Sequence, residues 1–68
     1  MNSKEFNQAV EIVKKLRQKP DQEELLQLYG LFKQAIIGNN NKGKNKETAE
    51  KEYIILVNSL IKKYKLKN

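Results

Sequence analysis

The stretch DQEELLQLYGLFKQAIIG, residues 21–38, decides how this chain folds. Asp21 and Glu24 have the spacing of a capping box, in which two side chains satisfy backbone N–H groups at the start of a helix. Apolar residues then cover more than half of the helix circumference, which indicates contacts on two sides. Gly38 suits the end of this helix, because glycine adopts the left-handed conformation at little cost. We therefore expect a helix over residues 21–37.

Two further helices are expected, one on each side of this stretch. Ser3 can cap a first helix over residues 3–19, whose apolar residues recur at helical spacing until Pro20 ends it. A last helix is expected over residues 46–64, with acidic residues in its first turns and lysines at its end, as the helix dipole favours. The polar run over residues 38–45 is typical of a loop. The sequence thus predicts a single all-α domain of three helices that spans the whole chain of 68 residues.

The composition narrows the classes of function. With no Cys and no His, the chain lacks thiolate nucleophiles, imidazole metal ligands and any side chain with an unperturbed pKa near neutrality. We expect no enzyme, no cofactor and no metal site. No apolar run approaches the ~20 residues of a membrane-spanning helix, and no secretory signal is visible, so we expect a soluble cytoplasmic protein. The net charge of +6 permits nucleic-acid binding, but residues 39–68 carry +5 of it and the first part is almost neutral.

Gly30 stands out because glycine inside a helix costs about 0.8–1 kcal/mol relative to alanine. Close approach of another backbone or of a ligand would explain it. Tyr29 and Lys33 lie four residues apart, and Phe32 lies between them, so an aromatic surface and a cation share one helix face. That face suits a ligand with a flat ring and a phosphate. On spacing alone, core aromatics beside a surface lysine explain the pattern better.

Three blocks of the sequence occur in a characteristic order. The first runs from Phe6 to Pro20, the second is YGLFKQAIIG at residues 29–38, and the third runs from Lys46 to Tyr64. Together they resemble the acyl-CoA-binding protein family, whose signature YGxYKQAxxG is similar to the central block. That family folds as an up-down-down-up bundle of four helices. The resemblance implies a minimal, three-helix version of that bundle, because the usual third helix and its tryptophan are missing here.

The resemblance also implies which residues bind the ligand. Tyr29 and Tyr53 match tyrosines at the nucleotide end of CoA, and Phe32 stands where a tyrosine usually stacks on adenine. Lys33 matches the lysine that pairs with the ribose 3′-phosphate, and Lys14 matches a lysine near the CoA phosphates. These assignments describe a site in which lysines neutralise phosphates and aromatic rings hold the base.

Other implied roles are less direct. Ala9 matches a small residue that lets the ligand approach the first helix. The phosphate-binding lysine of the family's third helix has no counterpart, and three lysines near the loop are conceivable substitutes: Lys42, Lys44 and Lys46. The acyl chain needs an apolar groove, for which the candidates on the second helix are Leu26, Leu28 and Ile36.

The function implied by the resemblance is that the protein binds long-chain fatty acyl-CoA esters and carries or buffers them, a lipid-transport role without catalysis. The alternative is a degenerate scaffold that serves as a protein-interaction or basic nucleic-acid-binding module. Loss of the third helix would expose apolar side chains, and a large exposed apolar patch is unusual for a soluble monomer. We therefore also expect that two chains pair through this surface or that the bound acyl chain covers it.

Overall fold

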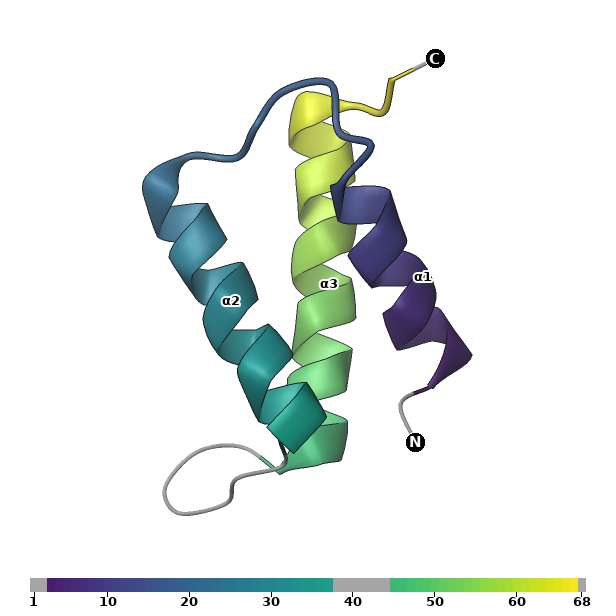
Figure 1. Ribbon diagram of the computed structural model, residues 1–68. Helices are drawn as coiled ribbons and strands as arrows, with labels where there is room; N and C mark the ends of the chain where they lie inside the picture. The colour runs from purple at the N-terminus through teal and green to yellow at the C-terminus, as the bar shows by residue number, and fades with distance from the viewer. Residues whose placement is uncertain (1–2, 38–44, 68) are drawn as a thin grey trace.

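The structure is a computed structural model, and it describes residues 3–37 and 45–67. It contains the helices α1 (Lys4–Val13), α2 (Gln22–Ile37) and α3 (Lys46–Tyr64), shown in Figure 1. The described residues form no named strand, so the predicted all-α, three-helix fold class is confirmed. Within these same residues, no helix combines the length and the apolar character needed to cross a membrane.

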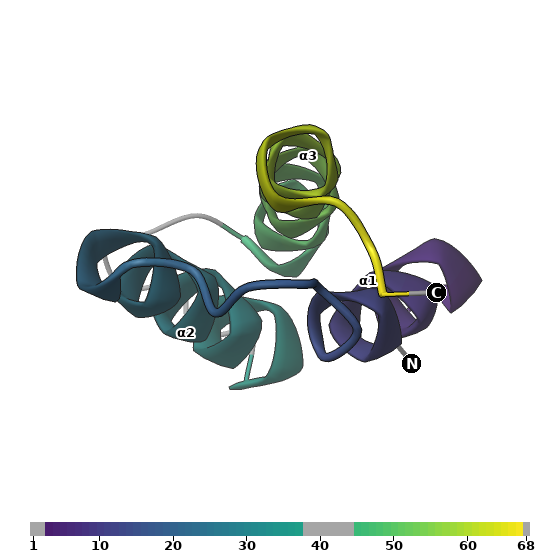
Figure 2. The ribbon, with the colours of Figure 1, turned by 90° about the horizontal axis from the view of Figure 1, so that it is seen from above.

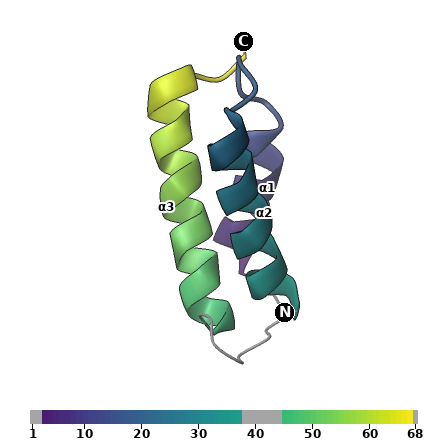
Figure 3. The same ribbon diagram turned by 90° about the vertical axis from the view of Figure 1, so that its left-hand side faces the viewer.

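The third helix is the central element of the fold. The chain runs up α1, down α2 and up α3, so α1 and α3 point the same way (Figure 1 and Figure 3). Viewed from above, α1 and α2 lie beside each other on one side of α3, and their connection passes between them (Figure 2). Both helices pack against α3, whereas no Cα atom of α1 comes within 8 Å of a Cα atom of α2. The space between α1 and α2 is therefore left to side chains and to a pocket.

Side-chain caps fix the start of each helix. The hydroxyl of Ser3 accepts a backbone N–H from the first turn of α1 at 3.1 Å, as the sequence predicts. Asp21 and Glu24 form the expected capping box, since each carboxylate accepts the other residue's N–H, at 3.0 and 3.1 Å. Asn45 caps α3 in the same way as Ser3 caps α1, at 2.8 Å. The helix starts are thus determined by local sequence.

The first helix is shorter than the sequence predicts, because α1 ends at Val13 and not at Lys19. The next two backbone N–H groups bond only three residues back, the tighter turn that often closes a helix. Residues 15–17 then leave the helix and pair with residues 65–67, beyond the end of α3. Leu16 is still only 5% exposed. It reaches the core from the paired segment that follows α1.

An aromatic cluster joins the three helices at the centre of the core. Phe6 of α1 is fully buried, and its ring stacks on Phe32 of α2 at a centroid distance of 6.0 Å. Tyr53 of α3 meets the same ring at 5.0 Å with a tilt of 58°. Such aromatic pairs contribute about 0.5–1.5 kcal/mol beyond their area burial. The buried apolar residues around this cluster are Phe6, Ala9, Leu16, Leu28, Ala35, Ala49, Tyr53, Val57 and Leu60.

Along the chain, α2 ends at Ile37 and α3 begins at Lys46. Residues 38–44 lie outside the described residues, and so do the predicted cap at Gly38 and the loop lysines Lys42 and Lys44. The antiparallel packing of α2 on α3 nevertheless agrees with the prediction of a bundle without a helix between them.

Candidate functional site

A pocket of about 550 Å³ lies between the end of α1, the α1–α2 connection and the first half of α2. This is within the usual size range of ligand pockets, roughly 300–1,000 Å³. Because α1 ends at Val13, the residues that follow it are free to cross to α2 as a non-helical connection, and this connection forms one wall of the pocket. The residues that line it are Val10, Val13, Lys14, Leu16, Arg17, Gln18, Lys19, Pro20, Leu25, Leu28, Tyr29, Phe32, Tyr53 and Lys67.

The aromatic part of the lining comes from α2 and α3. Phe32 and Tyr53 belong at once to the core cluster and to the pocket, with ring centroids 6.3 Å apart. Tyr29 is 61% exposed, so it stands at the outer edge where a ligand can reach its face. Burial raises the pKa of the Tyr53 hydroxyl, and the neighbouring Tyr29 phenol raises it further. Tyr53 is therefore an uncharged hydrogen-bonding group at neutral pH.

The charged part of the lining is entirely cationic. Lys14, Arg17 and Lys19 enter from the α1–α2 connection, and Lys67 enters from the segment after α3. No Asp or Glu is among the lining residues. Lys14 pairs with Glu11 at 3.6 Å, but both side chains are about two-thirds exposed, so the pair is weak. Within residues 3–37 and 45–67, no ion pair holds Arg17, Lys19 or Lys67.

Four of the six predicted ligand-binding residues line this pocket: Lys14, Tyr29, Phe32 and Tyr53. Lys33 is not among the lining residues; it lies exposed on α2, one turn beyond Tyr29. Ala9 is buried in the core and does not line the pocket, so any effect on the ligand would act through the packing of α1. Of the predicted groove residues, Leu28 lines the pocket, whereas Leu26 and Ile36 are exposed and do not line it. Lys46 is exposed at the start of α3.

Three lining cations were not singled out as site residues from the sequence: Arg17, Lys19 and Lys67. In the sequence, all three lie near the ends of the expected helices, where the helix dipole favours cations and so explains them without a ligand. For Lys19, the available signal is its place immediately before Pro20, which disfavours a helical conformation at that residue, and Arg17 lies two residues further back. Lys67 gave no such signal, because it reaches the pocket only through pairing between distant segments.

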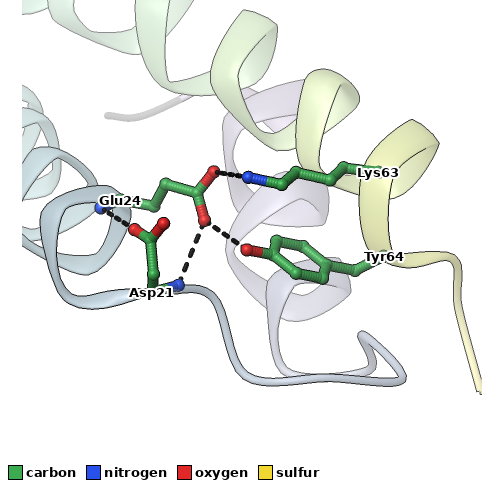
Figure 4. Close-up of polar contacts among 4 residues, drawn as sticks. All are labelled: Asp21, Glu24, Lys63 and Tyr64. Carbon is green, nitrogen blue, oxygen red and sulfur yellow. Dashed lines mark hydrogen bonds and ion pairs between the residues drawn. The ribbon is translucent and has the colours of Figure 1, made fainter.

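A polar cluster holds the start of α2 against the end of α3, beside the pocket. Figure 4 shows the carboxylate of Glu24 between these two helices. It accepts hydrogen bonds from the Tyr64 hydroxyl at 2.7 Å, from Lys63 Nζ at 3.0 Å and from the backbone N–H of Asp21 at 3.1 Å. The bond from Tyr64, followed by that from Lys63, lowers the pKa of Glu24. The cluster positions α2, which carries Leu25, Leu28, Tyr29 and Phe32 into the pocket.

The chemistry of these side chains favours binding of a ligand with an anionic part and an apolar or aromatic part. Across the described ranges, no group of three or more Asp or Glu residues could hold a metal ion. Cationic side chains without carboxylates attract phosphate, and exposed aromatic faces accept a stacked base. The fold and the pocket thus define a small helical protein suited to bind an amphipathic anion.

Comparison with known proteins agrees with this class. Residues 3–46 match the family described as Acyl CoA binding protein. The chain is 40% identical to the acyl-CoA-binding protein homolog of Drosophila melanogaster, over 94% of this chain and 99% of that protein. It is 40% identical to the acyl-CoA-binding protein of Saccharomyces cerevisiae, over 94% of this chain and 98% of that protein. The chain therefore belongs to the acyl-CoA-binding protein family.

The same alignments show that this member is shortened. The alignment with the Drosophila protein has 85 positions, whereas 94% of the 68 residues of this chain is about 64 residues. About 21 aligned positions therefore have no counterpart here. This agrees with the prediction that one helix of the usual bundle is missing.

Proposed function

We propose that this protein binds long-chain acyl-CoA esters and carries or buffers them without catalysing a reaction. The observation that carries the proposal is the pocket itself, in which four cations and three aromatic rings meet without a carboxylate. CoA has a 3′-phosphate, a pyrophosphate and an adenine ring, and the pocket offers partners for each. The relatives named above, which are acyl-CoA-binding proteins by name, support the same ligand.

The nucleotide end of the ligand is proposed to bind at the pocket. The adenine ring would stack on Tyr29 or Phe32, an interaction worth roughly 1–3 kcal/mol per base in nucleic-acid systems. Lys14 would pair with the phosphates from the α1–α2 connection. Lys33 would reach the part of the ligand that extends past Tyr29 along α2, since the two residues lie on one face of the helix. Tyr53 would offer its neutral hydroxyl from α3.

The acyl chain is proposed to lie on apolar side chains that the pocket and α2 leave accessible. Each buried CH₂ group contributes about 0.8 kcal/mol, so a long chain gains affinity with its length. Leu25 and Leu28 line the pocket, and Leu26 and Ile37 are more than 60% exposed on α2. These last two residues are about three helical turns apart and therefore share a face of α2.

A homodimer is proposed as the second way to cover this surface. Leu26 and Ile37 on α2, together with Ile55 on α3, remain exposed in the single chain. Sedimentation velocity at increasing concentration, with and without a C16 acyl-CoA, shows whether a second chain or the bound acyl chain covers these residues. A dimer that dissociates when acyl-CoA is added supports pairing through the surface that binds the acyl chain. A protein that stays monomeric at high concentration contradicts the proposed dimer.

Titration calorimetry with a C16 acyl-CoA tests the function. We expect binding by the unmodified protein, and affinity about tenfold weaker in Lys14→Ala and in Lys33→Ala, which is the loss of one hydrogen bond to a charged group. Lys51→Ala is the matched control, because Lys51 is an exposed lysine of α3 that does not line the pocket. Absence of binding by the unmodified protein, or equal losses in all three variants, would contradict the proposal.

A further inference from the structure

After α3 ends at Tyr64, the chain turns back across the top of the bundle towards α1 (Figure 1 and Figure 2). We call residues 65–67 the C-terminal strap. The strap pairs with the α1–α2 connection in antiparallel fashion, with Leu66 opposite Leu16. The N–H of Arg17 donates to the carbonyl of Lys65, and the N–H of Lys67 donates to the carbonyl of Lys15, both at 2.8 Å. The strap is thus fixed to the wall of the pocket.

The backbone of the strap begins with an unfavourable conformation. Lys65 has φ 67° and ψ 163°, a combination that is found almost only at glycine. It is held there from both sides, because its N–H donates to the carbonyl of Ile61 and its carbonyl accepts the N–H of Arg17. A non-glycine residue keeps such a conformation only when its surroundings hold it, and strained residues of this kind cluster at ligand sites.

The strap has a direct consequence for the charge of the pocket. Lys67 becomes a lining residue, although it is the last residue described and lies far in sequence from the other lining cations. Leu66 pairs with the buried Leu16 through the backbone, and the register of this antiparallel pairing places Lys67 at the pocket. By contrast, Lys62 and Lys63 in the last turn of α3 do not line it.

We propose that the C-terminal strap completes the anion-binding wall of the pocket and that Lys67 binds a phosphate group of the ligand. Lys14, Arg17 and Lys19 supply the wall from the α1–α2 connection, and Lys67 adds a cation from the other end of the chain. No carboxylate lines the pocket to neutralise it. This inference rests on the proposed function, since it assigns a further residue to the same site.

The test compares two ligands that share an acyl chain. One is a C16 acyl-CoA, and the other is the C16 thioester of pantetheine, which has no phosphate. In Lys67→Gln we expect about tenfold weaker binding of the acyl-CoA and unchanged binding of the pantetheine thioester. The dependence of acyl-CoA affinity on salt should also be less steep. Lys67→Arg, which keeps the charge, should bind within about twofold of the unmodified protein.

The matched control is Lys62→Gln, which removes the same charge from an exposed lysine outside the pocket. It should leave acyl-CoA affinity within about twofold, because Lys62 is exposed and does not line the pocket where the phosphate is proposed to bind. Equal acyl-CoA affinity in Lys67→Gln and the unmodified protein overturns the role of the strap while leaving the proposed function in place. Equal losses for both ligands also overturn it, because they indicate a purely structural effect. No binding by the unmodified protein overturns both.

Discussion

The Tyr64 hydroxyl donates a 2.7 Å hydrogen bond to the carboxylate of Glu24, which precedes it by 40 residues. Glu24 thereby has both a local role in capping a helix and a role in packing two helices together. It closes the capping box with Asp21 at the start of α2, and it ties that start to the last turn of α3. A single carboxylate therefore couples the start of one helix to the packing of two.

This link predicts that acid destabilises the fold. The pKa of Glu24 is lowered, chiefly by the bonds from Tyr64 and Lys63, so the folded state favours the ionised carboxylate. The stabilisation is complete above the ordinary glutamate pKa of about 4.3 and is lost as the pH falls through the lowered value. We expect the urea midpoint of unfolding to fall as the pH drops below ~5, and circular dichroism across a pH series measures it.

Glu24→Gln separates this effect from general acid destabilisation. Glutamine still fits the capping box, but it cannot lose stabilisation by protonation. The variant should be less stable than the unmodified protein at pH 7 and should lose less stability between pH 5 and pH 3. Glu23→Gln, which changes the exposed neighbouring residue, is the control. Parallel pH profiles for the unmodified protein and Glu24→Gln would contradict the assignment.

At the other end of the pH range, the same cluster predicts alkaline destabilisation. The pKa values of Tyr64 and Lys63 are both raised, and the hydrogen bond with Glu24 is the first cause for each. Their contributions are present below the ordinary values near 10 and are lost as the pH rises through the raised values. The stability plateau should therefore lie between about pH 5 and pH 10. In Tyr64→Phe, the alkaline fall should be smaller, and a fall as steep as in the unmodified protein would count against this cause.

A substitution at Gly30 tests whether the absence of a side chain at this position of α2 serves ligand binding or the stability of the fold. Apart from its two chain neighbours and the nearby backbone of α2 itself, no described atom lies within 4 Å of a Cβ placed at Gly30, so the folded chain leaves room for alanine. Gly30→Ala should raise the free energy of unfolding by about 0.8–1.0 kcal/mol through helix propensity. If the ligand approaches the backbone closely at this position, the same variant should bind acyl-CoA more weakly. Urea unfolding and calorimetry measure the two effects, and a loss of stability would show that α2 packs differently.

Phe6 should carry much of the stability of this small domain. Its fully buried ring contacts both Phe32 and Tyr53, so Phe6→Ala removes the centre of the aromatic cluster. The expected loss is about 3–5 kcal/mol, which equals what a core of this size usually supplies. We expect no cooperative thermal transition in this variant. Ile55→Ala, at an exposed position of α3, should change stability by no more than about 0.5 kcal/mol, and similar effects in both variants would contradict the proposed core.

The parts of the fold that could be predicted from the sequence are those that depend on residues close together in the chain. The Ser3 cap and the Asp21–Glu24 capping box involve residues three positions apart, and both are found in the structure. The end of α1 could not be placed in this way. The apolar pattern before Pro20 favours a helix that includes residues 15–17. In the structure, their backbone pairs instead with residues 65–67, which lie far away in the sequence.

The same distinction applies to the candidate site. Tyr29 and Phe32 lie within one motif, and both were predicted and line the pocket. Arg17 and Lys19 precede Pro20 in the sequence, but they line the pocket from a connection that exists only because α1 ends at Val13. Lys67 lines the pocket only because the C-terminal strap pairs with the α1–α2 connection. A charge count along the sequence cannot identify such a residue, because helix dipoles and solvated surfaces explain most lysines equally well.

Lys65→Gly tests the strained conformation that starts the strap. Glycine adopts φ 67° and ψ 163° without the steric cost, about 1–3 kcal/mol, that a side chain incurs there. The greater freedom of glycine in the unfolded chain offsets about 0.5–1 kcal/mol, so the net gain should be about 1 kcal/mol. Thermal unfolding should therefore shift upward by roughly 4–8 °C. Lys62→Gly, in the helical last turn of α3, is the matched control and should lower stability by about 0.8–1 kcal/mol. Opposite signs at two lysines three residues apart follow only if the backbone leaves the helix at Lys65, whereas destabilisation at both would mean that α3 continues through it.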